Sequence, residues 1–389
     1  MDHQQRAVIA LMKSALTRQP QALPEGFSLE QSLELIKKHH MTNLIYDGAV
    51  RCGLSRQDPA MQQLFRLYLR QLIKSEGQQS AIARIREAFL EENIDFMLLK
   101  GSRMKDLYPK PELRYMGDAD ILIRAEQYDR IRPVMERLGF AEKGESDHEL
   151  KWRSDALYVE LHKRLIPSYN RDLYAYYGEG WKLAVKGEGS EYFMKPEDEW
   201  IYLFTHFAKH YRDGGVGCRY VADLWLWRQK HPHMDEDYIR SVMDAMQIGA
   251  FYGHILRLLE YWFADGPADE VLEVIAQFIF ASGSWGVDEA KVLSVTVRDA
   301  KHSALGFSGR LMYLWKTAFP PVEVLRDKYT VLKKCPWLLP LVWLVRPFYK
   351  VAFEWRTLDR KKRHVEALSR DNVRLRREML ELVGLEYKF

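Results

Sequence analysis

Two acidic residues at the start of an apolar segment are the part of this sequence best suited to chemistry. Asp118 and Asp120 are separated by one residue, and the apolar run 121–123 that follows predicts a buried strand. Because side chains alternate along a strand, the two carboxylates point the same way and repel each other unless a cation lies between them. Mg²⁺ prefers carboxylate and phosphate oxygens as ligands. The pair therefore predicts a Mg²⁺ site.

Two further segments would complete such a site. Gly101 and Ser102 follow the apolar run 96–99 and predict a turn into a helix, where backbone N–H groups and a hydroxyl can bind phosphate. Residues 157–162 predict another strand, in which Glu160 can align beside the aspartates. Three carboxylates and a phosphate-binding turn are typical of a two-metal site for phosphoryl transfer.

The segment 98–162 resembles the nucleotidyltransferases of the polymerase-beta superfamily. Within them it is similar to a poorly characterised bacterial group found near polysaccharide and peptide natural-product genes. The resemblance lies in the motifs at 99–102, 108–114, 118–123 and 159–162. It covers the middle of the chain well and the C-terminal half loosely. Two departures are a slightly longer gap between Ser102 and Asp118 and the small Ala119, and neither removes an acidic residue.

The resemblance implies a reaction and assigns roles to residues. A nucleoside monophosphate would pass from a nucleoside triphosphate to a hydroxyl or similar acceptor, with release of pyrophosphate. The implied ligands of two Mg²⁺ ions, which are also the implied catalytic residues, are Asp118, Asp120 and Glu160. The implied contacts of the nucleotide phosphates are Lys100, Gly101, Ser102 and Arg114. The acceptor is open among a sugar, a small metabolite, a peptide and a protein, and the nucleotide among ATP, CTP, GTP and UTP.

Two other function classes fit parts of the pattern. A metal-dependent glycosyltransferase also uses Asp-x-Asp to hold a nucleotide sugar, but its fold normally has alternating strands and helices before the motif. Here the residues before Phe96 are predicted to be helical. A non-catalytic binding or scaffold protein would keep the fold without activity. The complete set of three carboxylates counts against that alternative, while the long helical flanks leave room for it.

Four polar residues in the C-terminal half match a helical pattern of the same bacterial group. His206 and His210 are four residues apart and share a helix face, as do Arg219 and Asp223. The histidine spacing suits zinc, but no third ligand is apparent, so core or interface histidines are favoured. A buried ion pair is the simpler interpretation of Arg219 and Asp223. The alternative is that these four residues line the acceptor pocket.

The strands and helices expected around the site predict an α+β fold, with a small mixed-sheet polymerase-beta-like core flanked by helical regions. The expected boundaries are 1–92 for the N-terminal helices, 93–195 for the core and 196–389 for the C-terminal helices. The predicted strands are 96–99, 120–123, 149–153 and 157–162, and the predicted helices include 102–107, 126–138, 200–211, 219–228 and 237–263. Ser28 with Gln31 predicts a capping box, and Asp58 before Pro59 predicts a helix start.

The bulk properties indicate a folded protein without a strong electrostatic preference. The chain has 389 residues and a formal net charge of +4, which is too small to predict nucleic-acid binding. Three scattered cysteines favour a reducing compartment. Because the N-terminus does not resemble a signal peptide and no apolar segment is long enough to span a membrane, we expect the cytoplasm.

Two C-terminal segments are compatible with larger partners. The basic run 360–363 and the aromatic segment 337–355 would suit an anionic membrane surface, although a solvated helix face is the simpler interpretation of the basic run. A heptad seam compatible with a homodimer consists of Val365, Leu368, Asn372, Leu375, Met379 and Leu382. Packing of this seam on its own domain is favoured because the seam is short.

Overall fold

The computed structural model describes residues 1–146, 148–167, 170–284, 286, 319, 322–325, 329, 331–345 and 370–385. The chain forms two compact units. The larger unit contains residues 1–209 and 216–285, and the smaller one contains residues 210–215 and 286–387. The boundaries at 92 and 195, which rest on the sequence pattern, remain a prediction.

The N-terminal segment is helical, as the sequence predicts. Its helices are α1 (His3–Thr17), α2 (Leu29–Lys38), α3 (Thr42–Arg51) and α4 (Pro59–Glu91). Asp58 begins α4 as expected, because its side chain accepts hydrogen bonds from the backbone N–H groups of Ala60 and Met61.

The predicted capping box at the start of α2 is right for one of its two hydrogen bonds and wrong for the other. Ser28 does accept a hydrogen bond from the backbone N–H of Gln31. Gln31 does not return it, because the N–H of Ser28 donates instead to Oε1 of Gln4 at 3.2 Å. A side chain from α1 therefore replaces the local partner, which a local motif cannot show.

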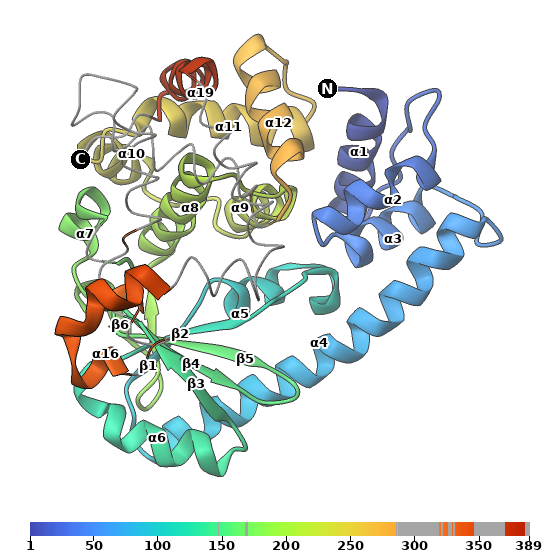
Figure 1. Cartoon of the computed structure of the whole chain (residues 1–389). Helices are drawn as coiled ribbons and strands as arrows, with labels where there is room; N and C mark the ends of the chain where they lie inside the picture. The colour runs from blue at the N-terminus through green and yellow to red at the C-terminus, as the bar shows by residue number, and fades with distance from the viewer. Residues whose placement is uncertain are drawn as a thin grey trace. The chain divides into compact units, whose positions relative to one another are not determined.

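A five-stranded mixed sheet forms the centre of the larger unit (Figure 1). Its strands are β1 (Phe96–Leu99), β2 (Ala119–Ile123), β3 (Ala141–Glu145), β4 (Glu149–Arg153) and β5 (Tyr158–His162). They lie in the order β1-β2-β5-β4-β3, and only β2 and β5 run parallel. The observed mixed sheet with flanking helices confirms the α+β fold class.

One face of this sheet is a continuous apolar surface. Ile121 and Ile123 of β2, Leu161 of β5 and Trp152 of β4 are fully buried there. They pack against α4 and against α6 (Tyr128–Arg137), which lie on the same side of the sheet in Figure 1. Because side chains alternate along each strand, the neighbouring residues of β2 and β5 must face the other way. That opposite face carries the candidate site.

The sequence did not predict three of the strands. Every residue of β3 is exposed, so this edge strand has no apolar alternation, and its pairing with β4 shifts between Glu142 and Gly144. The short hairpin of β6 (Ala184–Lys186) and β7 (Tyr192–Met194) is only three residues long on each side. Such strands are too short for a periodic pattern to stand out.

Further helices lie between β1 and β2 and after β5, and α8 runs from the larger unit into the smaller one. They are α5 (Gly101–Met104), α7 (Arg171–Tyr177), α8 (Pro196–Asp213), α9 (Cys218–Lys230), α10 (Glu236–Ala245), α11 (Gly249–Phe263) and α12 (Glu270–Ser282). Single-turn 3₁₀ segments lie at Lys105–Leu107, Pro111–Leu113, Ala125–Gln127 and Trp181–Leu183. The predicted helical stretch 237–263 is divided after Ala245, where Gln247 adopts a left-handed φ of 56° that interrupts a regular helix.

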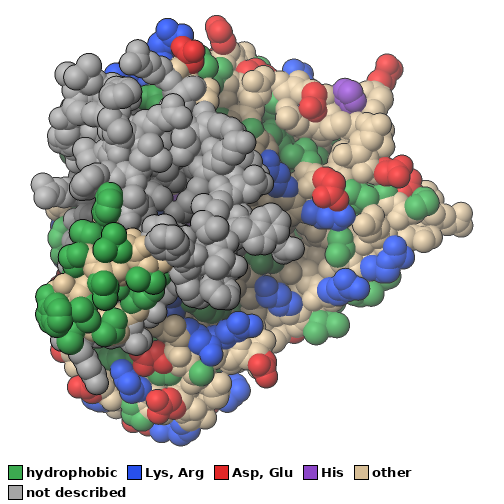
Figure 2. All heavy atoms as spheres, in the orientation of Figure 1, with side chains coloured by type: hydrophobic (Ala, Val, Ile, Leu, Met, Phe, Trp, Pro, Cys, Tyr) green, Lys and Arg blue, Asp and Glu red, His purple; other side chains and the backbone are tan. Residues whose placement is uncertain are grey.

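The described part of the smaller unit contains α15 (Val322–Leu325), α16 (Val331–Lys334), the 3₁₀ turn Pro336–Leu338 and α19 (Arg370–Val383). Hydrophobic side chains gather on the surface over the segment with α16 in Figure 2, where Trp337 is 76% exposed and Leu344 is 68% exposed. The basic run 360–363 lies outside the described residues, so contact with a membrane surface stays a prediction. Among the described residues, no helix combines the length and apolar character needed to cross a membrane.

Helix α19 buries a different face from the predicted heptad seam. Leu375 and Leu382 of the seam are 57% and 48% exposed. Leu380 and Val383 are buried instead, together with Arg376, which donates hydrogen bonds to the carbonyl oxygens of residues 211 and 212. Packing on their own unit is therefore wrong for Leu375 and Leu382, whereas Met379 of the seam is half-buried. Val365 and Leu368 lie outside the described residues, and pairing with a second chain stays a prediction.

Candidate active site

Three ionisable side chains meet on the face of the sheet opposite to α4 and α6. Asp120 of β2 is paired in register with Glu160 of β5, and His162 follows Glu160 by two residues. Ligand atoms of these three residues all lie within 4.8 Å of one another. Asp118 lies one residue before β2 and is close enough for its charge to act on both Asp120 and Glu160. The structure thus brings the three predicted carboxylates to one place.

Lys100 supplies the positive charge of this cluster. Its Nζ lies 3.1 Å from Oδ1 of Asp120 and 5.8 Å from the ring centre of Tyr202 in α8. The backbone of Lys100 has φ 43° and ψ −112°, a conformation that few residues with a side chain adopt. Strain of this kind costs on the order of 1–3 kcal/mol and persists where the surrounding structure requires it. Here it places the ammonium group of Lys100 against Asp120.

The carboxylates differ in how well the fold stabilises their charge. Burial alone would raise the pKa of Asp120, but Lys100 and the hydrogen bond from His162 lower it below its usual range. Burial and the charge of Asp120 raise the pKa of Asp118. Burial and the charges of Glu149 and both aspartates raise the pKa of Glu160 to about 7. The site therefore holds more negative charge than Lys100 balances, which is the condition that favours a bound cation.

His162 belongs to this cluster although the sequence assigned it no role. Its Nε2 donates a hydrogen bond of 2.7 Å to Oδ1 of Asp120, and its buried Nδ1 has no partner among the described residues. Burial lowers its pKa despite the nearby carboxylate. The available signal was its spacing of two residues from Glu160, which places both side chains on one face of β5.

A second cluster adjoins the first one along β4. Glu149, His148 and His162 also bring possible metal ligands within 4.8 Å of one another. Lys151, however, lies 2.9 Å from Glu149, and together with His148 it lowers the pKa of that carboxyl group. The ionised form of Glu149 is thus stabilised by its neighbours, whereas the pKa values of Asp118 and Glu160 are raised, so the carboxylates of β2 and β5 have more unbalanced charge to offer a cation.

The predicted phosphate-binding turn has a packing role that the sequence did not reveal. Gly101 is buried, and a Cβ at this position would come within 3.0 Å of Nη1 of Arg114 and 3.2 Å of Cγ of Met116. A side chain here would displace Arg114 or Met116 slightly, so close packing favours glycine whether or not a phosphate binds. The buried hydroxyl of Ser102 has no hydrogen-bond partner among the described residues, which leaves it available to a ligand.

Arg114 forms the buried ion pair that the sequence assigned to Arg219. Its Nε and Nη2 atoms both lie 2.8 Å from the carboxylate of Asp223, which also accepts a hydrogen bond from the hydroxyl of Tyr108. The expected pair of Arg219 and Asp223 is therefore wrong. Arg219 instead donates a 2.7 Å hydrogen bond to the carbonyl oxygen of Tyr115. With its guanidinium engaged in this way, Arg114 is poorly placed for the implied contact with a nucleotide phosphate.

The helical histidines lie among aromatic side chains. His206 is 9% exposed, and its ring lies 5.9 Å from that of Tyr220 in a stacked arrangement. Neither His206 nor His210 belongs to a group of three metal ligands in the described part of the chain. The surroundings of His206 agree with a core histidine, the interpretation favoured from the sequence, whereas His210 is half-buried.

Comparison with known proteins gives one family and one distant structural likeness. A family described as uncharacterised nucleotidyltransferases matches residues 25–264. No curated protein matches the chain. The solution structure of the antibiotic-resistance factor ANT(2'')-Ia is 12% identical, with a TM-score of 0.33, over 48% of this chain and 97% of that one. This likeness is too distant to carry an argument.

The family match includes the complete sheet and every residue of the carboxylate cluster. It agrees with the implied nucleotidyl transfer and gives no support to the glycosyltransferase alternative. The chain belongs to the family of uncharacterised nucleotidyltransferases.

Proposed function

We propose that this protein transfers a nucleoside monophosphate from a nucleoside triphosphate to a hydroxyl or similar acceptor, with Mg²⁺ and with release of pyrophosphate. The observation that carries the proposal is the cluster of Asp118, Asp120 and Glu160 on one face of the sheet, with Lys100 against Asp120. Carboxylate oxygens from two adjacent strands, with their charge only partly balanced, are a donor set that suits a hard divalent cation.

The roles of the residues follow from this geometry. Asp118, Asp120 and Glu160 would hold two Mg²⁺ ions, which when bound polarise the α-phosphate and offset the charge of the leaving pyrophosphate. Lys100 balances the charge of Asp120 before the substrate arrives and is placed to contact a phosphate oxygen afterwards. The hydroxyl of Ser102 is a further donor for the phosphates. His162 keeps Asp120 oriented through its hydrogen bond.

The test is calorimetric titration of the protein with non-hydrolysable analogues of the four nucleoside triphosphates, with and without Mg²⁺. We expect one analogue to bind only with Mg²⁺. Asp118→Asn should weaken this binding by ~10-fold or more, because it removes a charged ligand of the cation. Asp129→Asn is the matched control, since Asp129 is an exposed aspartate on α6.

Once an acceptor is known, Asp118→Asn should lower the transfer rate by roughly 10²–10³-fold, the effect of removing one group that stabilises transition-state charge. Full activity in the folded variant would contradict the assignment. No Mg²⁺-dependent binding of any nucleotide to the wild-type protein would instead favour the non-catalytic scaffold.

A further inference from the structure

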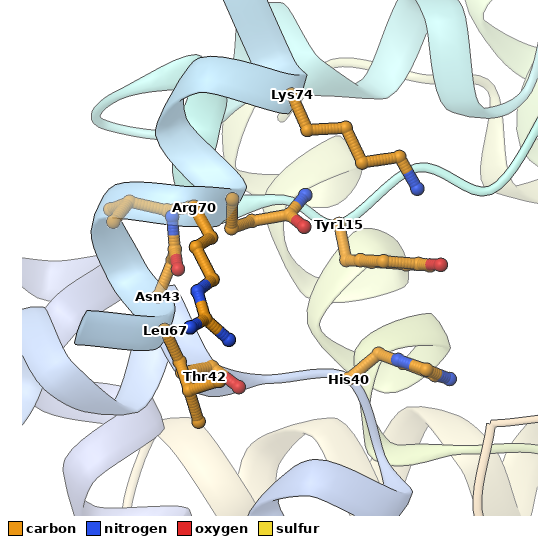
Figure 3. Close-up of a pocket in the computed structure, with 9 residues that line it drawn as sticks. His40, Thr42, Asn43, Leu67, Arg70, Lys74 and Tyr115 are labelled. Carbon is orange, nitrogen blue, oxygen red and sulfur yellow. The ribbon is translucent and has the colours of Figure 1, made fainter. Parts of the chain in front are cut away.

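A cavity of about 230 Å³ opens between the connection of α2 to α3, helix α4 and the chain that enters β2 (Figure 3). Pockets that enclose a drug-sized molecule have roughly 300–1,000 Å³. This cavity is smaller, so it suits one group of a larger ligand. Its walls contain no residue of the carboxylate cluster or of the turn at Lys100 to Ser102.

The charged side chains that line the cavity are all basic. Arg70 and Lys74 lie one helical turn apart on α4, and neither forms an ion pair with any residue that the structure describes. Among the residues that the structure describes, no aspartate or glutamate side chain lines the cavity. Burial and the positive charges of Arg219 and Lys74 lower the pKa of His40, which also lines the cavity. The cavity is therefore a region of positive potential with no internal counter-charge.

An aromatic side chain forms one wall of the cavity. The ring of Tyr115 stacks on the ring of His40 with a centroid distance of 4.4 Å, and Nζ of Lys74 lies 4.9 Å from the centre of the Tyr115 ring. Figure 3 shows Tyr115 between the side chains of Lys74 and His40, with all three pointing in the same direction. The ring of Tyr115 thus lies beside the basic group of Lys74 and the imidazole of His40.

Two amide side chains of the wall have unused hydrogen-bonding capacity. Asn43 is 3% exposed, and its Nδ2 donates to the carbonyl oxygen of Glu112 at 3.0 Å, which fixes the orientation of the amide. Its Oδ1 and the buried Nε2 of Gln71 have no partner among the described residues. Buried polar atoms are normally paired, so an acceptor and a donor without partners in one cavity point to a ligand that supplies both.

The cavity adjoins the carboxylate cluster. Tyr115 precedes Asp118 by three residues, so their Cα atoms are at most ~11 Å apart. Arg219 donates to the carbonyl oxygen of Tyr115 at 2.7 Å, and its charge acts on both groups: it partly offsets the rise in the pKa of Asp118 and adds to the effect of burial in lowering the pKa of His40. A substrate of modest length can therefore extend from this cavity to the carboxylates.

We propose that the cavity is the subsite for an anionic group, a phosphate or a carboxylate, of the acceptor substrate. Arg70 and Lys74 bind the anion, Gln71 Nε2 donates to it, and Asn43 Oδ1 accepts a hydrogen bond from a neighbouring hydroxyl of the same molecule. This inference rests on the proposed nucleotidyl transfer, and it assigns an acidic acceptor rather than a cationic one.

The test uses small probes in place of the unidentified acceptor. Phenyl phosphate and benzoate carry the two candidate anions, and benzylamine is the cationic control. Binding to the full chain is measured by calorimetry for three proteins. They are the wild type, a cavity variant with the two substitutions Arg70→Gln and Lys74→Gln, and a matched variant with the two substitutions Arg56→Gln and Arg66→Gln. The matched variant removes two exposed arginines that do not line the cavity.

We expect at least one anionic probe to bind the wild type and the matched variant, and benzylamine to bind neither. The cavity variant should bind the anion ~10-fold or more weakly, because two charge-assisted hydrogen bonds are lost. Its affinity for the Mg²⁺–nucleotide analogue should equal that of the wild type. The probe that binds distinguishes a phosphate from a carboxylate.

Three results would overturn the inference. The first is that neither anionic probe binds, and the second is that the cavity variant binds the probe as well as the wild type does. The third is that the cavity variant loses nucleotide binding, because the cavity would then hold the triphosphate. Probe binding without any nucleotide binding to the wild type would refute the proposed function and the acceptor role, whereas failure of the probes alone leaves the proposed function standing.

Discussion

The two faces of the five-stranded sheet are made by alternate residues of the same strands, yet they are stabilised in opposite ways. On one face, Ile121 and Leu161 are fully buried against α4 and α6. On the other face, their neighbours Asp120 and Glu160 gather negative charge, which Lys100 and Lys151 balance in part. The apolar face gains free energy from burial. The charged face includes two carboxyl groups whose ionised form the fold disfavours.

This difference shows where the fold is stabilised and where it is kept ready for a ligand. A raised carboxyl pKa means that ionisation costs stability, so a cluster of this kind is retained at a thermodynamic disadvantage until a cation binds. The apolar face must compensate for that disadvantage. Substitutions on the two faces are therefore expected to have opposite effects on stability.

The largest expected effect comes from breaking the apolar face. Ile121→Ala should lower the free energy of unfolding by about 2–5 kcal/mol, because it leaves a cavity among fully buried residues. Chemical denaturation measures the change, and Val185→Ala on the exposed side of β6 is the control. A loss below about 1 kcal/mol would mean that this face is not the stabilising one.

A buried histidine outside the sheet sharpens the comparison, because its polar atoms are satisfied. His39 accepts a hydrogen bond at Nδ1 from the backbone N–H of Cys218, and its Nε2 donates to the carbonyl oxygen of Phe280. Burial lowers the pKa of His39 to about 4, below its usual 6.5. As the pH falls, His39 therefore binds a proton at a higher pH in the unfolded chain than in the folded one. The contribution of His39 to stability should therefore fall by roughly 3 kcal/mol as the pH drops from 6.5 to 4, and this contribution should level off below pH 4.

The contribution of His39 is isolated by comparing unfolding curves at several pH values. His39→Asn should be less stable than the wild type near neutral pH, with a smaller loss of stability on acidification. His233→Asn, which changes an exposed histidine, should keep the slope of the wild type. An unchanged slope in His39→Asn would show that this histidine is not held neutral by the fold.

The smallest and most diagnostic effect is expected on the charged face. Glu160→Gln should raise the stability of the metal-free protein at pH 8 by about 1–2 kcal/mol, because it removes a carboxylate that its acidic neighbours repel. Thermal unfolding with and without Mg²⁺ measures this change in stability. Added Mg²⁺ should stabilise the wild type more than the variant. Glu136→Gln on the exposed side of α6 should change neither quantity. Destabilisation by Glu160→Gln would show that the carboxylates support the fold.

The sequence predicted the parts of the site that follow from local rules. The alternation of side chains in β2 and β5 placed Asp120 and Glu160 on one face, and the apolar runs located β1, β4 and β5 closely. The N-cap at Asp58 depends on adjacent residues and was also predicted. Such features need no information about distant parts of the chain.

Tertiary structure decided which charged residue meets which. Arg114 and Asp223 are 109 positions apart, and their pairing replaced the expected local pair with Arg219. His162 joined the cluster through Asp120, 42 positions away, and the basic cavity combines residues from three separate segments. Local spacing determines which way a side chain points, whereas its partner depends on how elements pack. Only the folded chain therefore shows which charges are neutralised in the core and which remain for a substrate.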